Sequence, residues 1–122
     1  MTTLDRQRLD DLVRHVGARH AAALLGRIPR SLDGQCAELG AAREPASARL
    51  LAHRLKGLAA TSGLPMVADT AARIEIAAVA GQSWSTDALL AAVAEGVGEL
   101  RRYLVEIRNG AEITDPEAAR RH

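Results

Sequence analysis

Apolar residues recur every three or four positions along most of this chain, and glycine or proline interrupts the pattern at intervals. This spacing places the apolar side chains on one face of an α-helix, whereas a β-strand would need strict alternation. Alanine and leucine dominate the composition, phenylalanine is absent, and there is one tryptophan and one tyrosine. Because these residues favour helices over strands, the sequence predicts an all-α protein.

The interruptions divide the chain into five expected helices. The first covers about residues 4–16, with Thr3 as its cap and Gly17 as its stop. The second covers about residues 18–39 and contains Pro29, which cannot donate a helical hydrogen bond, so we expect a kink or two shorter helices there. Three further helices are expected from Pro45 to the break at Gly63, from Pro65 to Ala80, and from Ser83 or Ser85 to about Arg108, before the stop signal Asn109-Gly110.

Short loops between amphipathic helices imply antiparallel neighbours, and therefore an up-down helical bundle. A length of 122 residues is typical of one domain. We expect this domain to cover residues 1–110 and the polar residues 111–122 to form a C-terminal tail.

Several classes of site are disfavoured by the composition. Cys36 is the only cysteine, which excludes an internal disulfide and a zinc–thiolate cluster, and no Glu-x-x-His pair is present for a metal site in a bundle. The formal net charge is +1 and the arginines are scattered among acids, so we expect no nucleic-acid partner and a solvated face at Arg101, Arg102 and Arg108. The polar N-terminus and the absence of a long apolar run predict no membrane span and a cytoplasmic location.

The segment around His53 stands apart from the rest of the chain. On a helical wheel, Leu51, Leu55, Leu58 and Ser62 lie opposite His53, so the histidine should point toward solvent. The cation Lys56 and the small residues Gly57 and Ala60 lie within about 60° of it. Lys56 is the only lysine beside fifteen arginines.

This combination suits a histidine that carries a phosphoryl group. An exposed imidazole is partly neutral near pH 7, so that one ring nitrogen can attack phosphorus. A neighbouring lysine offsets the charge of the phosphoryl oxygens. Small neighbours leave room for the active site of a partner, and a glycine in mid-helix costs about 1 kcal/mol, so Gly57 indicates a steric requirement.

These residues resemble a known family. The run His53-x-x-Lys56-Gly57, the small Ala60, the loop glycine Gly63 and the pair Ile74-Glu75 are similar to the motif of histidine-phosphotransfer (HPt) domains of bacterial phosphorelays. The resemblance implies an antiparallel four-helix bundle with a short additional N-terminal helix. It also implies that His53 is phosphorylated, that Lys56 assists, and that Gly57 keeps the site open.

The resemblance further implies a phosphocarrier without kinase activity, because no nucleotide-binding loop is present. The expected partners are response-regulator receiver domains and a hybrid sensor histidine kinase. The receiver domain is expected to supply Mg²⁺, so the chain needs no cofactor or metal of its own. The chain is expected to be a monomer. Arg49, Leu50, Arg54 and Ala60 form the expected docking rim. A bundle that serves only as a scaffold or dimerisation module remains the alternative, and a small helical metalloenzyme is disfavoured by the missing ligand spacing.

Overall fold

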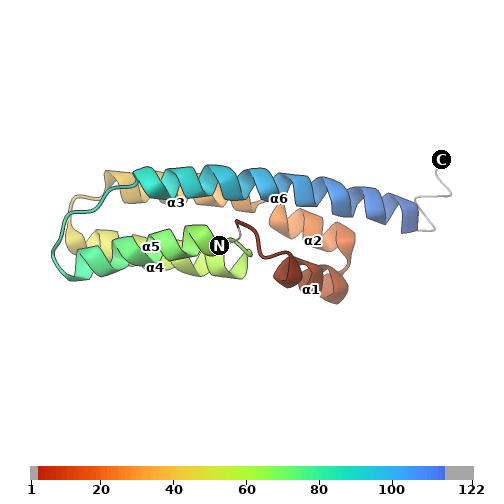
Figure 1. The fold of residues 1–122 in the computed structure, drawn as a ribbon, viewed down its shortest axis with the longest axis horizontal. Coiled ribbons are helices and arrows are strands. Elements are labelled where there is room, and N and C mark those ends of the chain that lie inside the picture. The colour runs from red at the N-terminus through yellow and green to blue at the C-terminus, as the bar shows by residue number, and fades with distance from the viewer. Residues whose placement is uncertain (1–2, 115–122) are drawn as a thin grey trace.

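The computed structural model describes residues 3–114, with side chains for residues 3–110, and all secondary structure in this part of the chain is helical. The all-α prediction is therefore confirmed. The helices are α1 (Arg6–Val16), α2 (Ala18–Leu25), α3 (Ile28–Ala41), α4 (Pro45–Thr61), α5 (Pro65–Val79) and α6 (Asp87–Thr114) (Figure 1).

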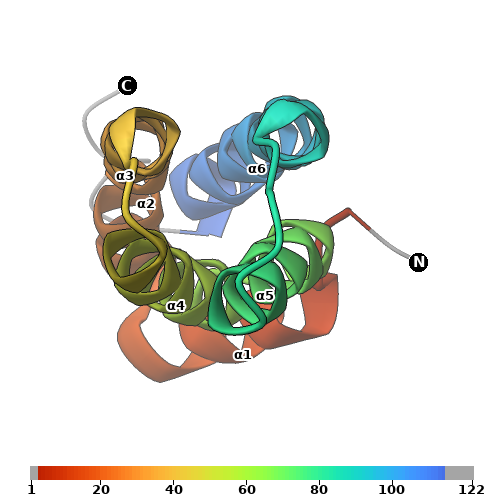
Figure 2. The ribbon, with the colours of Figure 1, turned by 90° about the vertical axis from the view of Figure 1, so that its left-hand side faces the viewer.

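Consecutive helices pack beside one another, except α2 and α3, which follow each other in line (Figure 1). Contacts join α3 to α4, α4 to α5, and α5 to α6, and α6 also packs against α2 and α3. Viewed along the molecule, α3 and α6 lie on one side and α4 and α5 on the other, with α1 on the same side as the α4–α5 pair (Figure 2). The pair α4–α5 carries the predicted site, and it has the most extensive contact of any two helices.

The region expected to form the second helix forms two shorter helices. Of the two alternatives expected at Pro29, a kink or a division into two helices, the division is correct. The first of them ends at Leu25, and the second begins at Ile28 with Pro29 in its first turn, where a missing N–H is tolerated. A Cβ atom at Gly26 would lie 2.9 Å from the Ala22 carbonyl oxygen, which favours glycine at this joint.

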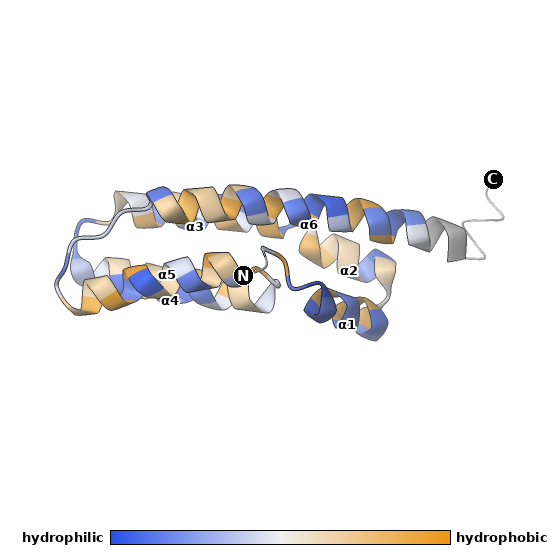
Figure 3. Cartoon of the chain, viewed as in Figure 1, coloured by the Kyte–Doolittle hydropathy of each residue, from blue (hydrophilic) through white to orange (hydrophobic). Residues whose placement is uncertain are grey.

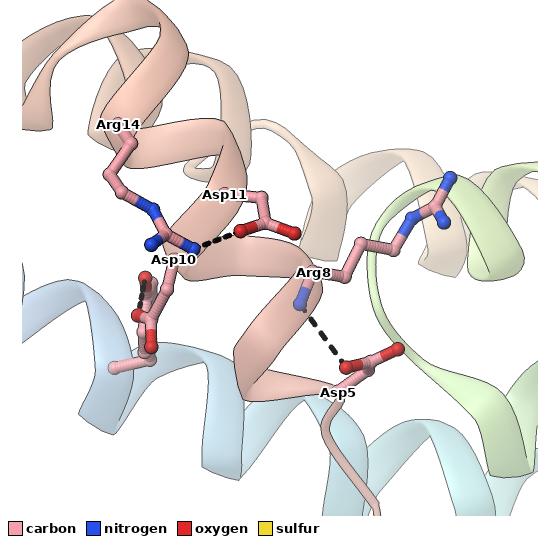
Figure 4. Close-up of polar contacts among 6 residues, drawn as sticks. Asp5, Arg8, Asp10, Asp11 and Arg14 are labelled. Carbon is pink, nitrogen blue, oxygen red and sulfur yellow. Dashed lines mark hydrogen bonds and ion pairs between the residues drawn. The ribbon is translucent and has the colours of Figure 1, made fainter.

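The start of the first helix differs from the prediction. The helix begins at Arg6 and its cap is Asp5, not Thr3, because the Asp5 carboxylate accepts a hydrogen bond from the Arg8 backbone N–H at 3.2 Å (Figure 4). The Asp5 N–H donates to the Gly63 carbonyl at 2.8 Å, and Gly63 adopts a positive φ of 74° in the turn between α4 and α5. The Arg8 side chain extends to the same turn and donates to the Thr61 carbonyl at 3.2 Å. The N-terminal segment is thus fastened to the turn that follows the α4 helix.

The predicted stop at Asn109-Gly110 is wrong, since α6 continues to Thr114. Gly110 does not adopt the positive φ that ends a helix, so the backbone continues without a break. The expected boundary between residues 110 and 111 therefore lies inside a helix. α3 likewise continues beyond the expected end at residue 39 and ends at Ala41. The rest of the expected tail, residues 115–122, lies outside the described residues.

The core is built from leucine on some faces and alanine on others. Each helix combines hydrophobic and hydrophilic residues, as the period of 3.6 requires (Figure 3). On α4 the expected stripe is only partly correct: Leu55 and Ser62 are buried, whereas Leu51 and Leu58 are half-buried at its edge. The most buried positions of α4 also include small side chains that the prediction omitted, namely Ala48, Ala52 and Ala59.

Candidate functional site

His53 lies in the middle of α4 and points away from the core. Its side chain is 62% exposed, whereas the preceding residue, Ala52, is fully buried. The orientation predicted from the helical wheel is therefore confirmed. A histidine in this position is accessible to another protein.

Glu75 on α5 connects His53 to Lys56. One carboxylate oxygen, Oε2, lies 2.6 Å from Nδ1 of His53, and the other, Oε1, accepts a hydrogen bond from Nζ of Lys56 at 2.8 Å. The Glu75 side chain is only 17% exposed, which shields both interactions from water on one side. One carboxylate on α5 thus fixes two side chains that lie one turn apart on α4.

The ionised carboxylate of Glu75 determines which ring nitrogen of His53 donates the hydrogen bond between them. The hydrogen bond from Lys56 lowers the pKa of the Glu75 carboxyl most, partial burial opposes this shift, and the His53 hydrogen bond lowers the pKa further. An ionised carboxylate can only accept hydrogen bonds, so Nδ1 of His53 is the donor. In a neutral imidazole the remaining nitrogen, Nε2, then carries the free lone pair, and no described residue forms a hydrogen bond with it. Nε2 is therefore the ring nitrogen whose lone pair is available to another molecule.

Lys56 is less exposed than the sequence indicated. Its side chain is 35% exposed and reaches across to α5, because the alanine residues between the two helices allow them to approach closely. Ala52 and Ala59 of α4 and Ala71 of α5 are fully buried. The lysine therefore lies at the margin between core and solvent, held by Glu75.

Small residues surround the exposed ring on the side of the α4 C-terminus. A Cβ atom at Gly57 would meet no heavy atom within 4 Å, so no internal contact requires glycine at this position. A hollow of about 380 Å³ opens beside Lys56. Its walls include Ala60 of α4 and Ala68 and Ala72 of α5, with the charged residues Arg8 and Asp69 also at its lining.

The expected docking rim is exposed at all four positions. Arg49, Leu50, Arg54 and Ala60 all lie on the solvent side of α4, and the Leu50 residue is 52% exposed although it is apolar. In the described part of the chain, no three histidine, cysteine or acidic side chains are grouped so that they could hold a metal ion. None of the described helices is long and apolar enough to cross a bilayer.

A family model for the Hpt domain matches residues 6–110. This chain belongs to the Hpt family. No curated protein and no solved structure matches the chain. Hpt domains act as phosphocarriers in phosphorelays, where they interact with response-regulator receiver domains and kinases, and they are not themselves kinases.

Glu75 is the residue of this Hpt domain that sequence reasoning did not place in the site. The pair Ile74-Glu75 contributed to the resemblance, but no role followed from it. A local signal was nevertheless present: Glu75 follows the buried Ile74, and the other two charged residues of α5, Asp69 and Arg73, pair with each other. An acidic residue at the edge of such a helix, opposite a histidine and a lysine, is a candidate partner for both.

Proposed function

We propose that this Hpt domain accepts a phosphoryl group on His53 from the phospho-aspartate of a receiver domain and passes it to another response regulator. The observation that supports this proposal is the arrangement of three side chains. His53 is exposed, its Nδ1 is 2.6 Å from the Glu75 carboxylate, and the same carboxylate holds Lys56. A nucleophile that is oriented by a neighbouring charged group is a recurrent arrangement in group transfer.

In the proposed step, Nε2 of His53 attacks the phosphorus atom of the acyl phosphate. The new N–P bond forms while the bond between phosphorus and the aspartyl oxygen breaks, and the aspartate leaves as a carboxylate. Nδ1 keeps its proton, so the ring gains positive charge as the bond forms. The Glu75 carboxylate, already hydrogen-bonded to Nδ1, stabilises this charge. Transfer to the next regulator is the reverse step with a different aspartate.

Lys56 and the receiver domain share the task of stabilising the phosphoryl oxygens. The Nζ atom of Lys56 lies one helical turn from His53 and is flexible enough to exchange part of its contact with Glu75 for a phosphoryl oxygen. Mg²⁺ belongs in this proposal to the receiver domain, and the Hpt domain contributes no metal ligand or cofactor of its own.

The surface around His53 is the proposed docking site. Leu50 offers an exposed apolar contact, Arg49 and Arg54 offer charge, and Gly57 and Ala60 leave space for the partner's active site. The hollow beside Lys56 can receive a side chain of the receiver domain. The proposal includes a cytoplasmic, monomeric protein whose α2–α6 helices act as an antiparallel up-down bundle, with α1 as the short additional helix.

The test is transfer of label from a phosphorylated receiver domain to the purified chain. We expect an acid-labile, base-stable phosphoprotein, and we expect His53→Gln to accept no label. His15→Gln is the matched control, because His15 is also exposed but lies on α1. If the parent accepts no label from any of a broad panel of receiver domains, the scaffold alternative is favoured. Equal labelling of His53→Gln and the parent would contradict the site.

A further inference from the structure

A second charged hollow lies between the α2–α3 joint and the second half of α6. Its lining contains three arginines, one aspartate and several apolar or small residues, and none of them belongs to α4 or α5. The volume is about 600 Å³. We call this hollow the arginine groove; its residues are Gly26, Pro29, Arg30, Asp33, Arg101, Leu104, Val105 and Arg108.

The arginines of this groove differ from the exposed arginines that are paired within their own helices. Arg14, Arg73 and Arg102 each form an ion pair with a carboxylate three or four residues away on the same helix. Within residues 3–110, no carboxylate lies three or four positions from Arg101 or Arg108, because apolar residues and glycine occupy positions 97, 98, 104 and 105. The sequence predicted one solvated face at Arg101, Arg102 and Arg108. In the structure Arg102 is paired with Glu99, whereas Arg101 and Arg108 line the groove.

The apolar part of the groove gives it a second kind of contact. Leu104 is almost fully buried and forms part of the floor, whereas Val105 is 55% exposed at the rim. Three guanidinium groups against one carboxylate leave the groove more positive than the chain as a whole, whose formal net charge is +1. A ligand that fits must therefore combine negative charge with apolar surface.

We infer that the arginine groove binds an acidic, amphipathic segment of a partner protein, at a surface separate from the His53 site. Arg101 and Arg108 are seven residues apart, so their backbone positions are separated by about 10 Å along α6. This separation matches carboxylates two turns apart on a helix. Arg30, from α3, provides the charge on the opposite wall.

The same features argue against a nucleic-acid backbone as the ligand. Asp33 in the lining would repel a row of phosphates, and the exposed Val105 would gain no apolar partner from it. Because the groove contains no residue of α4 or α5, an acidic segment bound there would leave His53 free. A partner could thus remain attached while the phosphoryl group moves at the other site.

The experiment measures binding of a fluorescein-labelled amphipathic peptide that carries glutamates two helical turns apart beside a leucine stripe. Fluorescence anisotropy on the full chain should show saturable binding that weakens with salt, as expected for charge pairing. The double variant Arg101→Ala/Arg108→Ala should weaken this binding about tenfold or more. Arg102→Ala, on the same helix but paired with Glu99, is the matched control and should bind as the parent does.

Arg30→Ala tests the opposite wall and should also weaken binding, so that the result does not depend on variants of α6 alone. Circular dichroism checks that every variant keeps its helical content. No peptide binding at low salt, equal binding by the double variant, or preferential binding of a single-stranded oligonucleotide would each overturn the inference. The measurement requires no phosphoryl transfer, so it is independent of the role proposed for His53.

Discussion

Glu75 on α5 lies 2.6 Å from His53 on α4, and this contact joins the two helices at the centre of the site. The carboxylate fixes Nδ1 as the donor, so the free lone pair lies on Nε2. The same carboxylate holds Lys56 at 2.8 Å. A single residue therefore sets the tautomer of the histidine, the direction of the ring and the position of the nearby cation.

Glu75→Gln should slow phosphoryl transfer to His53 by roughly 10-fold to 100-fold, by analogy with the loss of a partner that orients a metal-ligating histidine. Glutamine keeps the size of the side chain but cannot stabilise the positive charge on the ring. Rapid-quench labelling from a phosphorylated receiver domain measures the rate. Glu99→Gln is the control, because Glu99 is paired with Arg102 on α6. An unchanged rate in Glu75→Gln would show that the carboxylate has no role in transfer.

Lys56→Ala should slow transfer about tenfold without abolishing it, which corresponds to about 1.4 kcal/mol of transition-state stabilisation. The lysine assists the phosphoryl oxygens, but it forms no bond to phosphorus. Arg73→Ala, which removes another exposed cation from the α4–α5 pair, should leave the rate unchanged. Complete loss of labelling in a folded Lys56→Ala protein would contradict the assisting role.

The same substitution should alter the titration of Glu75. Because the Lys56 hydrogen bond is the largest cause of the lowered pKa of Glu75, its removal should move this pKa upward toward the ordinary value of 4.5. In the parent, the stabilisation from ionised Glu75 is present above pH 4.5 and is lost as the pH falls below it. Carboxyl titration followed by NMR spectroscopy measures the shift directly, and an unchanged Glu75 pKa would contradict this assignment.

Gly57→Ala should stabilise the fold and slow transfer at the same time. A Cβ atom would meet nothing within 4 Å, so alanine gains about 1 kcal/mol of helix propensity at no steric cost inside the chain. The added methyl group instead occupies space that a docked receiver domain needs. Gly34→Ala is a close control, since Gly34 also lies in a helix with nothing within 4 Å. It should raise stability similarly and leave transfer unchanged. Chemical denaturation and labelling measure the two effects, and equal transfer by both variants would contradict the steric role of Gly57.

The position of His53 could be predicted because it depends only on the period of one helix. Leu55, on the opposite side of α4, and Ser62, directly after its last residue, are buried, as the helical wheel requires. The contact with Glu75 could not be predicted in this way, because it depends on the register of α5 against α4. That register follows from how the buried side chains of the two helices pack together, which sequence periodicity does not specify.

Helix ends were predictable where a residue cannot continue the helical backbone, through a positive φ or a missing N–H group. Gly17 has a φ of 86° and ends the first helix, and Pro29 begins a new one. At Asn109-Gly110 the same kind of signal is overridden, because glycine tolerates the helical conformation at a cost of only about 1 kcal/mol. The helical hydrogen bonds of α6 therefore continue through Gly110 to Thr114.

Tyr103 is the basis of the last prediction, which concerns stability at high pH. Its hydroxyl donates to the carboxylate of the exposed Asp10 at 2.7 Å, and the tyrosine residue is 1% exposed, so it links α6 to α1 at the edge of the core. Burial, and then the contact with Asp10, raises the pKa of Tyr103 well above its ordinary value of 10. The unfolded chain therefore releases the phenolic proton first, and the free energy of unfolding should fall as the pH rises above 10.

Tyr103→Phe removes this contribution. At neutral pH the variant should lose about 1 kcal/mol, the net value of one hydrogen bond, and above pH 10 its stability should fall less steeply than that of the parent. Cys36→Ala is the control for the buried thiol. Burial raises the pKa of Cys36 above 9.0, so the thiol also makes the free energy of unfolding fall at high pH. Only the Cys36→Ala variant should lose this second contribution. Urea denaturation at a series of pH values on either side of 10 separates the two contributions. If Tyr103→Phe and the parent show the same slope, the tyrosine does not remain protonated in the folded state and the inferred role of its hydrogen bond is wrong.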